Sequence, residues 1–504
     1  MKMKNRFIYI IIALMTIGLS GCGSFLDVND DPNNPTEEYM TLEYRLPAAL
    51  YHTALQEVTQ LNQLGSFWAG YWGPNTDGTN SYKKEQLYNG FSIMAKRDGI
   101  PIWENGYTYL NYYELLKKQA DKEGARHYGA IARIMQAWHY MRLVDVYGDV
   151  PFDQALQDDK YPRPVYDDGK YVYQKSMEMI NVAIDMLKQT PAARESVPRS
   201  ADIVFAGDPV KWMKFANTLK LRALLRQSEV GESSYITDEI AKINSDGNGF
   251  ITEIAFVQPG FNASNLNPFW STYYRNTSNK TTTTYTYIRP TQYIIDRYES
   301  LNDPRVGKLY VENPNGDYKG VPFGYLGSSA VYNKTNTSAF RGPSENGNKP
   351  GGILKSSTQP IVLLGDFESW FLQAEAAQRG WISGNTQEFY ENGVRASFKY
   401  MEVAQADTDA YFSQADVAFN NTLDRIILQK WLALNSISGF EAWCDFRRLS
   451  IPSIPNSESA AAGEYPGRLM YPETEAQTNI AQVKKKNITV ITKARVWWDI
   501  NKLK

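Results

Sequence analysis

The sequence predicts a mostly α-helical protein in which helical hairpins form a scaffold, a large loop-rich insertion interrupts that scaffold, and β-strands are few. The first observation is that apolar residues recur every three or four positions over several long stretches. The second is a change of composition between residues 245 and 360, where Gly, Asn, Thr, Ser and Tyr dominate and the helical period disappears. Helices are therefore expected on both sides of this region, at residues 43–64, 102–120, 125–147, 171–188, 209–226, 366–379 and 422–435.

The helix expected at residues 125–147 organises the rest of the scaffold. Its apolar residues have the spacing of one buried helix face, at Ile131, Ile134, Met135, Trp138 and Met141. Gly148 can adopt the left-handed conformation that ends many helices, and Pro151 cannot continue a helix. The pattern predicts a core helix that ends at a sharp corner. The next helix pair is similarly marked, because Asp208 suits the cap and Pro209 the first turn of the helix at 209–226.

The length of 504 residues exceeds one ordinary hydrophobic core, so we expect two substructures or one large one with insertions. The irregular region at 245–360 is rich in aromatic side chains, which argues against plain disorder and favours a functional role. The expected division is a signal peptide at 1–21, a lipid-anchored tether at 22–42, an N-terminal helical scaffold at 43–244, a loop-rich ligand-binding insertion at 245–360, and C-terminal helices that complete the scaffold at 361–504.

The N-terminus has the features of a lipoprotein signal. Lys2, Lys4 and Arg6 precede an apolar run of 13 residues from Phe7 to Leu19, which is shorter than the ~20 residues that a membrane-spanning helix needs. The run ends in small residues directly before Cys22. We expect cleavage before Cys22 and its lipidation, which anchors a protein without a spanning helix. The alternative is an ordinary secretory peptide or an N-terminal anchor helix. Cys444 then has no partner, so no intrachain disulfide is expected.

Composition and motifs exclude several classes of function. The formal charge of −2 becomes −5 once the three cations of residues 1–21 are removed, which does not fit a nucleic-acid-binding protein. No metal-binding histidine or cysteine spacing, phosphate loop or nucleophile elbow occurs, so neither cofactor, metal nor catalysis is expected. Residues 27–38 have the ligand spacing of a calcium loop, but Pro32 stands where that loop needs glycine. Glu375 and Glu441 are expected to pair with Arg379, Arg447 or Arg448 as part of the scaffold.

Two segments combine aromatic rings with polar side chains, as a sugar-binding site requires. Sugars present flat C–H faces that lie on aromatic rings, while their hydroxyls need amide, carboxylate or guanidinium partners. Trp72 follows a helix and precedes Gly73-Pro74, and Trp270 follows Pro268, so we expect both rings to be exposed and to form a stacking platform. The alternative for Phe67 and Trp68 is that they end a helix and pack inside. The candidate ligand-binding residues are Trp68, Tyr71, Trp72, Asn75, Asp77, Trp270, Tyr273, Tyr274 and Arg275.

Several strings lie in order along most of the mature chain. The first is DVYGDVPF at 145–152, at the corner after the organising helix. The others are KW at 211–212 with FANTLKLR at 215–222, ESWFLQAEAAQRGW at 368–381, QKW at 429–431 with FEAW at 440–443 and Arg447-Arg448, and the C-terminal RLMYPE at 468–473, Asn479 and VWWD at 496–499. Together these strings resemble the SusD/RagB family of outer-membrane nutrient-binding lipoproteins from Bacteroidetes-type bacteria.

The resemblance implies a tetratricopeptide-like packing of the helical hairpins and a non-enzymatic function. A member of this family is expected to be a cell-surface lipoprotein of the outer membrane that captures oligosaccharide and delivers it to a TonB-dependent β-barrel transporter. Peptide capture by the same kind of lipoprotein is the alternative within the family. A surface glycoside hydrolase that uses unidentified carboxylates, and a structural adaptor that binds only protein, are alternatives of other classes.

Overall fold

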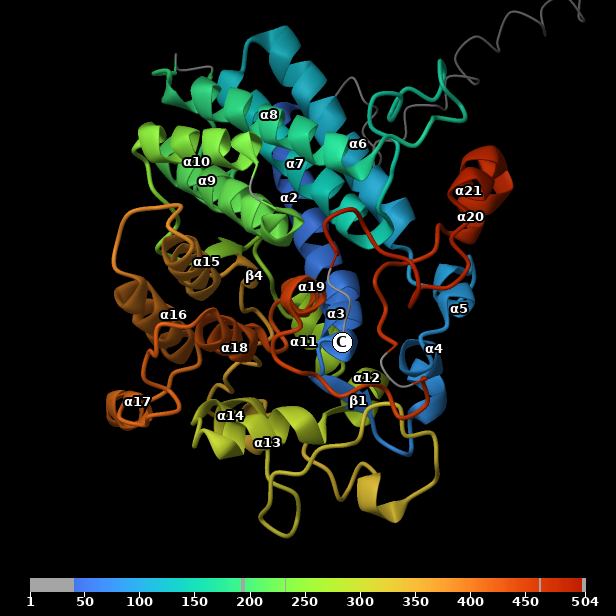
Figure 1. The fold of residues 1–504 in the computed structure, drawn as a ribbon, viewed down its shortest axis with the longest axis vertical. Helices are drawn as coiled ribbons and strands as arrows, with labels where there is room; N and C mark the ends of the chain where they lie inside the picture. The colour runs from blue at the N-terminus through green and yellow to red at the C-terminus, as the bar shows by residue number, and fades with distance from the viewer. Residues whose placement is uncertain (1–39, 192–194, 232, 462–463, 501–504) are drawn as a thin grey trace, which may run out of the picture.

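A computed structural model of the chain describes residues 40–191, 195–231, 233–461 and 464–500. The expected signal peptide, the lipidated Cys22, the calcium-like spacing at 27–38 and nearly all of the expected tether lie outside the described residues. Helices dominate the part of the chain that the structure describes, and its strands form two small antiparallel pairs (Figure 1). The mostly α-helical fold class with little β-structure is confirmed.

The first half of the chain is a stack of helical hairpins, which fills the upper part of Figure 1. Each of α6, α7, α8 and α9 packs against the next helix in the sequence, which is the arrangement of a tetratricopeptide-like scaffold. The helices are α2 (Leu42–Gln56), which continues through the π-helical turn Glu57–Leu61 into α3 (Asn62–Trp68), then α4 (Lys83–Gln86), α5 (Gly90–Met94), α6 (Ile102–Glu123), α7 (Arg126–Tyr147), α8 (Gly169–Lys188), α9 (Pro209–Arg226) and α10 (Ser234–Asp246).

Local sequence signals explain where the scaffold helices begin. The Asp208 carboxylate accepts hydrogen bonds from the N–H groups of Val210 and Lys211, at 2.9 and 3.2 Å, and Pro209 occupies the first turn of α9. The predicted cap of this helix is thereby confirmed. Asp168 caps α8 in the same way. These side chains satisfy N–H groups that would otherwise have no partner in the first helical turn.

The organising helix α7 is buried along almost its whole length, and it ends at Gly148. Gly148 has the predicted positive φ, +76°, but its ψ of −113° is not left-handed helical. A distant segment adds a second requirement for glycine, because a Cβ at this position would be 2.8 Å from a guanidinium nitrogen of Arg468. Both the turn itself and the C-terminal segment that contains Arg468 therefore fix the corner.

The last part of the chain returns to the scaffold and completes it. α15 packs against α9, α16 and α18, while α19 packs against α3, so the two ends of the sequence share one core. The helices are α15 (Asp366–Gln378), α16 (Thr386–Tyr400), α17 (Gln405–Phe412), α18 (Leu423–Leu434), α19 (Gly439–Leu449), α20 (Glu473–Thr478) and α21 (Ile480–Lys486).

A buried network of ion pairs joins these two halves. Glu441 on α19 is fully buried and pairs with Arg142 on α7 and Arg226 on α9. Burial raises the pKa of Glu441, but Arg222, Arg226 and Arg142 outweigh burial and hold that pKa well below its usual range. The expectation that Glu441 pairs with the arginines near it in sequence is wrong, because α19 turns its carboxylate toward α7 and α9.

The second predicted scaffold carboxylate behaves as expected. Glu375 on α15 pairs with Arg379 at 3.0 Å and with Arg448 at 2.7 Å. The guanidinium of Arg447 instead lies 3.7 Å from the ring centroid of Trp443 and donates to backbone carbonyls.

The segment between the two helical halves contains short helices and short strands, in the lower part of Figure 1. Loss of helical periodicity predicted irregular structure there, and nine-residue α13 is the main departure from that prediction. The two strand pairs tie this segment to the scaffold, since β1 pairs with β3 and β2 with β4. The elements are β1 (Trp72–Pro74), β2 (Ala255–Val257), α11 (Pro268–Tyr273), α12 (Thr283–Tyr287), β3 (Ile288–Pro290), α13 (Gln292–Ser300), α14 (Arg305–Leu309) and β4 (Ile361–Leu364).

Candidate functional site

The loop after α3 is joined to the loop-rich segment residue by residue. β1 pairs with β3, and the N–H of Asn75 then donates to the carbonyl of Tyr287 at 2.8 Å. The N–H of Thr76 donates to the Tyr332 carbonyl at 3.0 Å, and the Asp77 carboxylate accepts from the N–H of Lys334 at 2.9 Å. These contacts join the loop after α3 to the loop-rich segment. The ring of Trp72 also packs against that of Tyr273, so the two segments singled out in the sequence lie in one region of the molecule.

The expectation that Trp72 and Trp270 are exposed is wrong. Trp72 has no accessible surface, and its ring packs against Tyr273 and Phe340 while its indole N–H donates to Ser436 at 2.8 Å. Trp270 is 9% exposed. The rings of Phe67, Tyr273 and Phe340 surround the Trp72 ring, which Gly73-Pro74 was expected to leave open to solvent. An aromatic ring without accessible surface cannot stack on a sugar, so Trp72 cannot form half of a stacking platform with Trp270.

Most of the other candidate residues are also buried and have partners within the protein. The Trp68 indole N–H donates to the Glu85 carbonyl at 3.2 Å, so the alternative in which this ring ends a helix and packs inside is the correct one. Tyr71, Asn75, Tyr273 and Tyr274 are buried as well. Asp77 is exposed, and the side chain of Arg275 is 21% exposed. Ligand contact by these last two stays a prediction.

Three tyrosines that the sequence reasoning did not single out are partly exposed in the same region. The rings of Tyr325 and Tyr332 meet edge to face with their centroids 5.5 Å apart. The ring of Tyr287 lies directly on Gly78, where a Cβ would come within 2.4 Å of it. A signal was present in the sequence, because all three stand in stretches of Gly, Ser, Thr and Asn rather than in an apolar period.

A buried arginine holds this loop region in place. Arg289 on β3 is 4% exposed and has no carboxylate partner among the described residues. Its guanidinium donates to the Thr337 hydroxyl at 3.1 Å and to the carbonyls of Tyr285 and Lys334 at 2.9 and 3.1 Å. Burial lowers its pKa to about 10. These bonds fix the segments on both sides of Tyr287 before any ligand arrives.

A polar hollow of about 410 Å³ is lined by residues that directly follow the loop after α3 in the chain. Its size falls in the range of small-molecule sites. Tyr287 lies on Gly78, and the lining begins two residues further along the chain. The lining carries amides, hydroxyls and cations but a single carboxylate, that of Asp98: Asn80, Ser81, Lys83, Lys84, Leu87, Asn89, Ser92, Ala95, Arg97 and Asp98.

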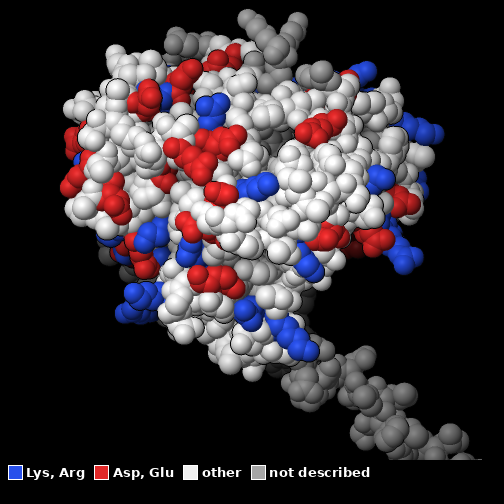
Figure 2. Space-filling view, turned by 90° about the horizontal axis from the view of Figure 1, so that it is seen from below, with Lys and Arg blue, Asp and Glu red and all other residues white. Residues whose placement is uncertain are grey.

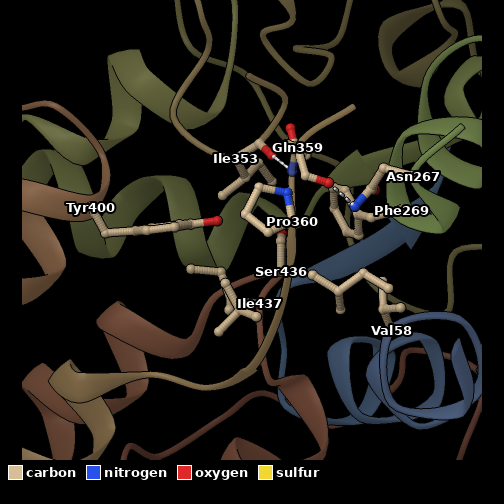
Figure 3. A pocket seen from close by; sticks show the side chains of 11 residues that line it. Val58, Asn267, Phe269, Ile353, Gln359, Pro360, Tyr400, Ser436 and Ile437 are labelled. Carbon is tan, nitrogen blue, oxygen red and sulfur yellow. Dashed lines mark hydrogen bonds between the residues drawn. The ribbon is translucent and has the colours of Figure 1, made fainter. Parts of the chain in front are cut away.

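A second cavity, shown in Figure 3, is too small for a sugar. It measures about 30 Å³, which is enough for one or two water molecules. Asn267 donates to the carbonyl of Gln359 at 2.8 Å, and the Gln359 side chain donates to the carbonyl of Ile353 at 2.9 Å. Both bonds lie within the loop-rich segment and hold one wall of this cavity closed.

The face of the molecule seen from below carries charges of both signs, separated by wide neutral areas (Figure 2). No broad patch of one sign is visible on it. Such a surface does not suit nucleic acid, which requires a continuous basic surface.

Sequence comparison decides the family. The family model described as "Starch-binding associating with outer membrane" matches residues 32–472, well over half of the chain. The chain belongs to the SusD-like family. No curated protein matches it in sequence.

Solved structures agree with this assignment. A SusD homolog from Bacteroides uniformis is 23% identical over 91% of this chain and all of its own, with a TM-score of 0.72. A chitin-binding SusD homolog from Flavobacterium johnsoniae is 23% identical over 90% of this chain and 99% of its own, also with a TM-score of 0.72. A chitin-binding protein is 25% identical over 92% of this chain and all of its own, with a TM-score of 0.71. This SusD-like chain thus shares the fold of these proteins over nearly its full length.

Two further findings concern the described residues of this SusD-like protein. No helix among them combines the length and the apolar character needed to cross a membrane. Within the same residues, no three His, Cys, Asp or Glu side chains are grouped so that they could hold a metal ion.

Proposed function

We propose that this SusD-like protein is a lipid-anchored binding protein of the outer-membrane surface that captures glycan and delivers it, chemically unchanged, to a TonB-dependent transporter. The observation that carries the proposal is the pairing of the loop after α3 with the loop-rich segment, because the partly exposed Tyr287 then lies on Gly78, two residues before the lining of a polar hollow of about 410 Å³ begins. The family description names starch binding, and two structural relatives are described as chitin-binding.

The proposed ligand site combines the two kinds of contact that a sugar needs. Tyr287 offers a partly exposed ring for stacking, and Tyr325 and Tyr332 extend the aromatic surface. Asn80 and Asn89 offer amides for hydroxyl groups, and the exposed Asp77 and the partly exposed Arg275 add charged partners nearby. The ligand-binding role of the segment at 245–360 is part of this proposal.

The lining of the hollow supports binding rather than hydrolysis. Most glycosidases place two carboxyl groups about 5–10 Å apart on either side of the scissile bond. The residues that line the hollow include one carboxylate, Asp98, whose backbone carbonyl accepts from the Lys84 ammonium. Capture without chemistry is therefore the function that this lining favours.

The test of function is a glycan and peptide array probed with the soluble mature protein, followed by overnight incubation with the best ligand. We expect binding to at least one oligosaccharide class and recovery of that ligand intact by mass spectrometry. Binding to peptides alone would replace the glycan by peptide as the captured nutrient. Cleaved ligand, with cleavage abolished by changing one carboxylate, would make the protein an enzyme.

The proposed anchor is tested separately at Cys22. Replacement Cys22→Ala removes the thiol that would carry the lipid, so labelling with a fatty-acid analogue should disappear and the protein should be soluble or uncleaved. The matched control is Cys444→Ala, which removes the buried thiol and should leave labelling unchanged. Continued membrane association of the Cys22 variant after a carbonate wash would contradict the lipid anchor.

The proposed transporter partner is tested by co-purification. A protein that closes over a transporter needs a stable contact that buries well above ~1,000 Å². Mild detergent extraction of the outer membrane should therefore recover a large β-barrel protein together with the anchored chain. Recovery of the anchored chain alone would favour a receptor that works without this partner.

A further inference from the structure

A cavity of about 530 Å³ lies on the helical scaffold, and the proposed glycan site does not include it. One wall is a single face of α6, where Trp103, Glu104, Tyr107, Thr108, Asn111 and Tyr112 follow one another at helical spacing. The opposite wall is the loop that leaves the corner after α7, and Glu475 on α20 completes the lining. In Figure 1 this loop, α6 and α20 lie on the upper right side of the molecule.

The walls of this cavity are held in place without a ligand. The Tyr107 hydroxyl donates to the carbonyl of Pro151 at 2.9 Å and so ties α6 to the loop. The Thr474 hydroxyl donates to Glu104 at 2.5 Å and ties the C-terminal segment to α6. Three prolines line the loop wall, Pro151, Pro162 and Pro164, which restricts its backbone. The cavity is therefore preformed, and binding there costs little ordering of the protein.

Aromatic rings line the inner part of the cavity. Trp103 is 5% exposed, and its ring packs against Tyr107 with the centroids 5.0 Å apart. Tyr107 and Tyr112, which belong to the α6 wall, are partly exposed. Rings of this kind attract the apolar body of a ligand and also a cation placed over their faces.

The charged groups that line the cavity are all negative. They are the carboxylates of Glu104, Asp158 and Glu475, and the lining contains neither Lys, Arg nor His. None of the three forms an ion pair within the described residues. Glu475 is bound by the Tyr166 hydroxyl at 2.5 Å, a neutral partner that leaves its charge uncompensated. Elsewhere in the scaffold, buried carboxylates such as Glu375 and Glu441 have arginine partners.

We infer that this cavity is a second binding site, which takes a ligand bearing an ammonium group on an apolar or sugar body. The cation would be neutralised by the lining carboxylates and would face the rings of Tyr107 and Tyr112, while the body of the ligand fills the remaining volume. An amino sugar and a lysine side chain of a peptide both carry this chemistry. The site is independent of the glycan site proposed above.

The experiment uses pairs of probes that differ in one charge. Tri-glucosamine is compared with its fully N-acetylated form, and an N-acetylated Ala-Lys-Ala amide is compared with the same peptide acetylated on its lysine. Titration calorimetry on the soluble mature protein measures each affinity at low and at high salt. We expect at least one amine to bind and its acetylated partner to bind at least tenfold more weakly at this site. Binding of the amine should weaken as salt rises. The sugar and peptide arms show which source of the ammonium group the site prefers.

Two variants locate the binding. Asp158→Asn removes one lining carboxylate and should weaken amine binding about three- to thirtyfold, as expected for loss of a charged contact. Asp159→Asn is the matched control, because it makes the same change of charge at the next, exposed residue, which does not line the cavity. Both variants should keep the melting temperature of the wild type.

Failure of both amines to bind up to about 10 mM would overturn the inference. It would also be overturned by equal affinity for the acetylated probes, or by equal effects of the two variants. The acetylated trisaccharide can also occupy the proposed glycan site, so the sugar pair is compared in the Tyr287→Ala background. These outcomes then do not bear on the glycan site, which is tested at other residues.

Discussion

The rings of Trp72 and Tyr273 pack against each other with their centroids 5.0 Å apart, and neither side chain exposes any surface. The two residues come from the two segments that the sequence marked as candidate binding loops. Their contact explains why the segments lie together and why the most prominent ring in the first of them cannot reach a ligand. The aromatic residues at this junction are therefore part of the core, and the ligand contacts are proposed for the partly exposed residues around it.

Replacement Trp72→Ala should therefore destabilise the fold. Removing a fully buried Trp side chain costs about 3–5 kcal/mol, and the Ser436 hydroxyl also loses its indole donor. Urea denaturation should show this loss as an earlier unfolding transition. The matched control is Tyr332→Ala, at a partly exposed ring of the same region, which should change stability by much less. Unchanged stability of the Trp72 variant together with lost glycan binding would mean that the Trp72 ring is exposed and contacts the glycan.

The prediction of exposure failed for a physical reason that the sequence does not display. A Trp before Gly-Pro has the local pattern of a surface loop, and the rings of Tyr273 and Phe340 that cover it lie more than 200 residues away in the chain. Local patterns were sufficient for the helices, because the period of apolar residues and caps such as Asp208 act within a few residues. They were not sufficient for the site, whose tyrosines are placed by Arg289 and by contacts between distant loops.

A similar limit applies at the corner after α7. The sequence predicted positive φ at Gly148 correctly, but it contained no sign that Arg468 would fill the space beside it. The ion-pair partners of Glu441 could not be predicted from local sequence either. Arg142 is nearly 300 residues away in the chain and Arg226 more than 200. The family resemblance predicted the scaffold as a whole, because its motifs cover helices from both halves.

Replacement Gly148→Val should destabilise the corner. A β-branched residue at φ +76° is strained, and its Cβ would collide with the Arg468 guanidinium 2.8 Å away. The expected cost is about 1–3 kcal/mol, measured as a lower melting temperature. Gly247→Val is the matched control, because Gly247 has nearly the same φ, +75°, with open space around its Cβ position. Equal losses in the two variants would mean that backbone strain alone sets the cost and that Arg468 yields freely.

Replacement Glu441→Gln should be strongly destabilising. It leaves the buried guanidinium groups of Arg142 and Arg226 without their carboxylate, and breaking such a buried pair costs about 3–5 kcal/mol of folding stability. Glu391→Gln makes the same chemical change at a partly exposed pair with Arg395 and should cost less than about 1 kcal/mol. A small effect at Glu441 in urea denaturation would contradict its role in joining α7, α9 and α19.

His139 should make the fold less stable as the pH falls below about 6.5. Burial, with a smaller effect from Arg142, lowers its folded pKa to about 3, while an unfolded histidine titrates near 6.5. The unfolded state thus binds more protons between these values, so stability is complete above pH 6.5 and is lost on acidification. The loss is at most about 1.4 kcal/mol per pH unit for this group. His52 and His127, whose pKa values burial also lowers, act in the same direction.

The measurement compares unfolding free energies at pH 7.5 and pH 5 for the wild type and for His139→Gln. Carboxylates contribute equally to both proteins, so the difference between the two slopes isolates His139. The variant should lose less stability on acidification than the wild type. Identical slopes would mean that His139 takes up a proton in the folded protein as readily as in the unfolded one.

The central claim, glycan capture beside the hollow at residues 80–98, is tested most directly by titration calorimetry with the best glycan from the array. The proteins compared are the soluble mature wild type, Tyr287→Ala and a distant surface control, Tyr44→Ala, whose ring is 67% exposed on α2. Stacking and burial on one ring contribute about 1–3 kcal/mol, so Tyr287→Ala should weaken binding about five- to a hundredfold, with little change in melting temperature. Tyr44→Ala should bind as the wild type does. Undiminished binding by the Tyr287 variant, or no glycan binding by the wild type at all, would contradict the account.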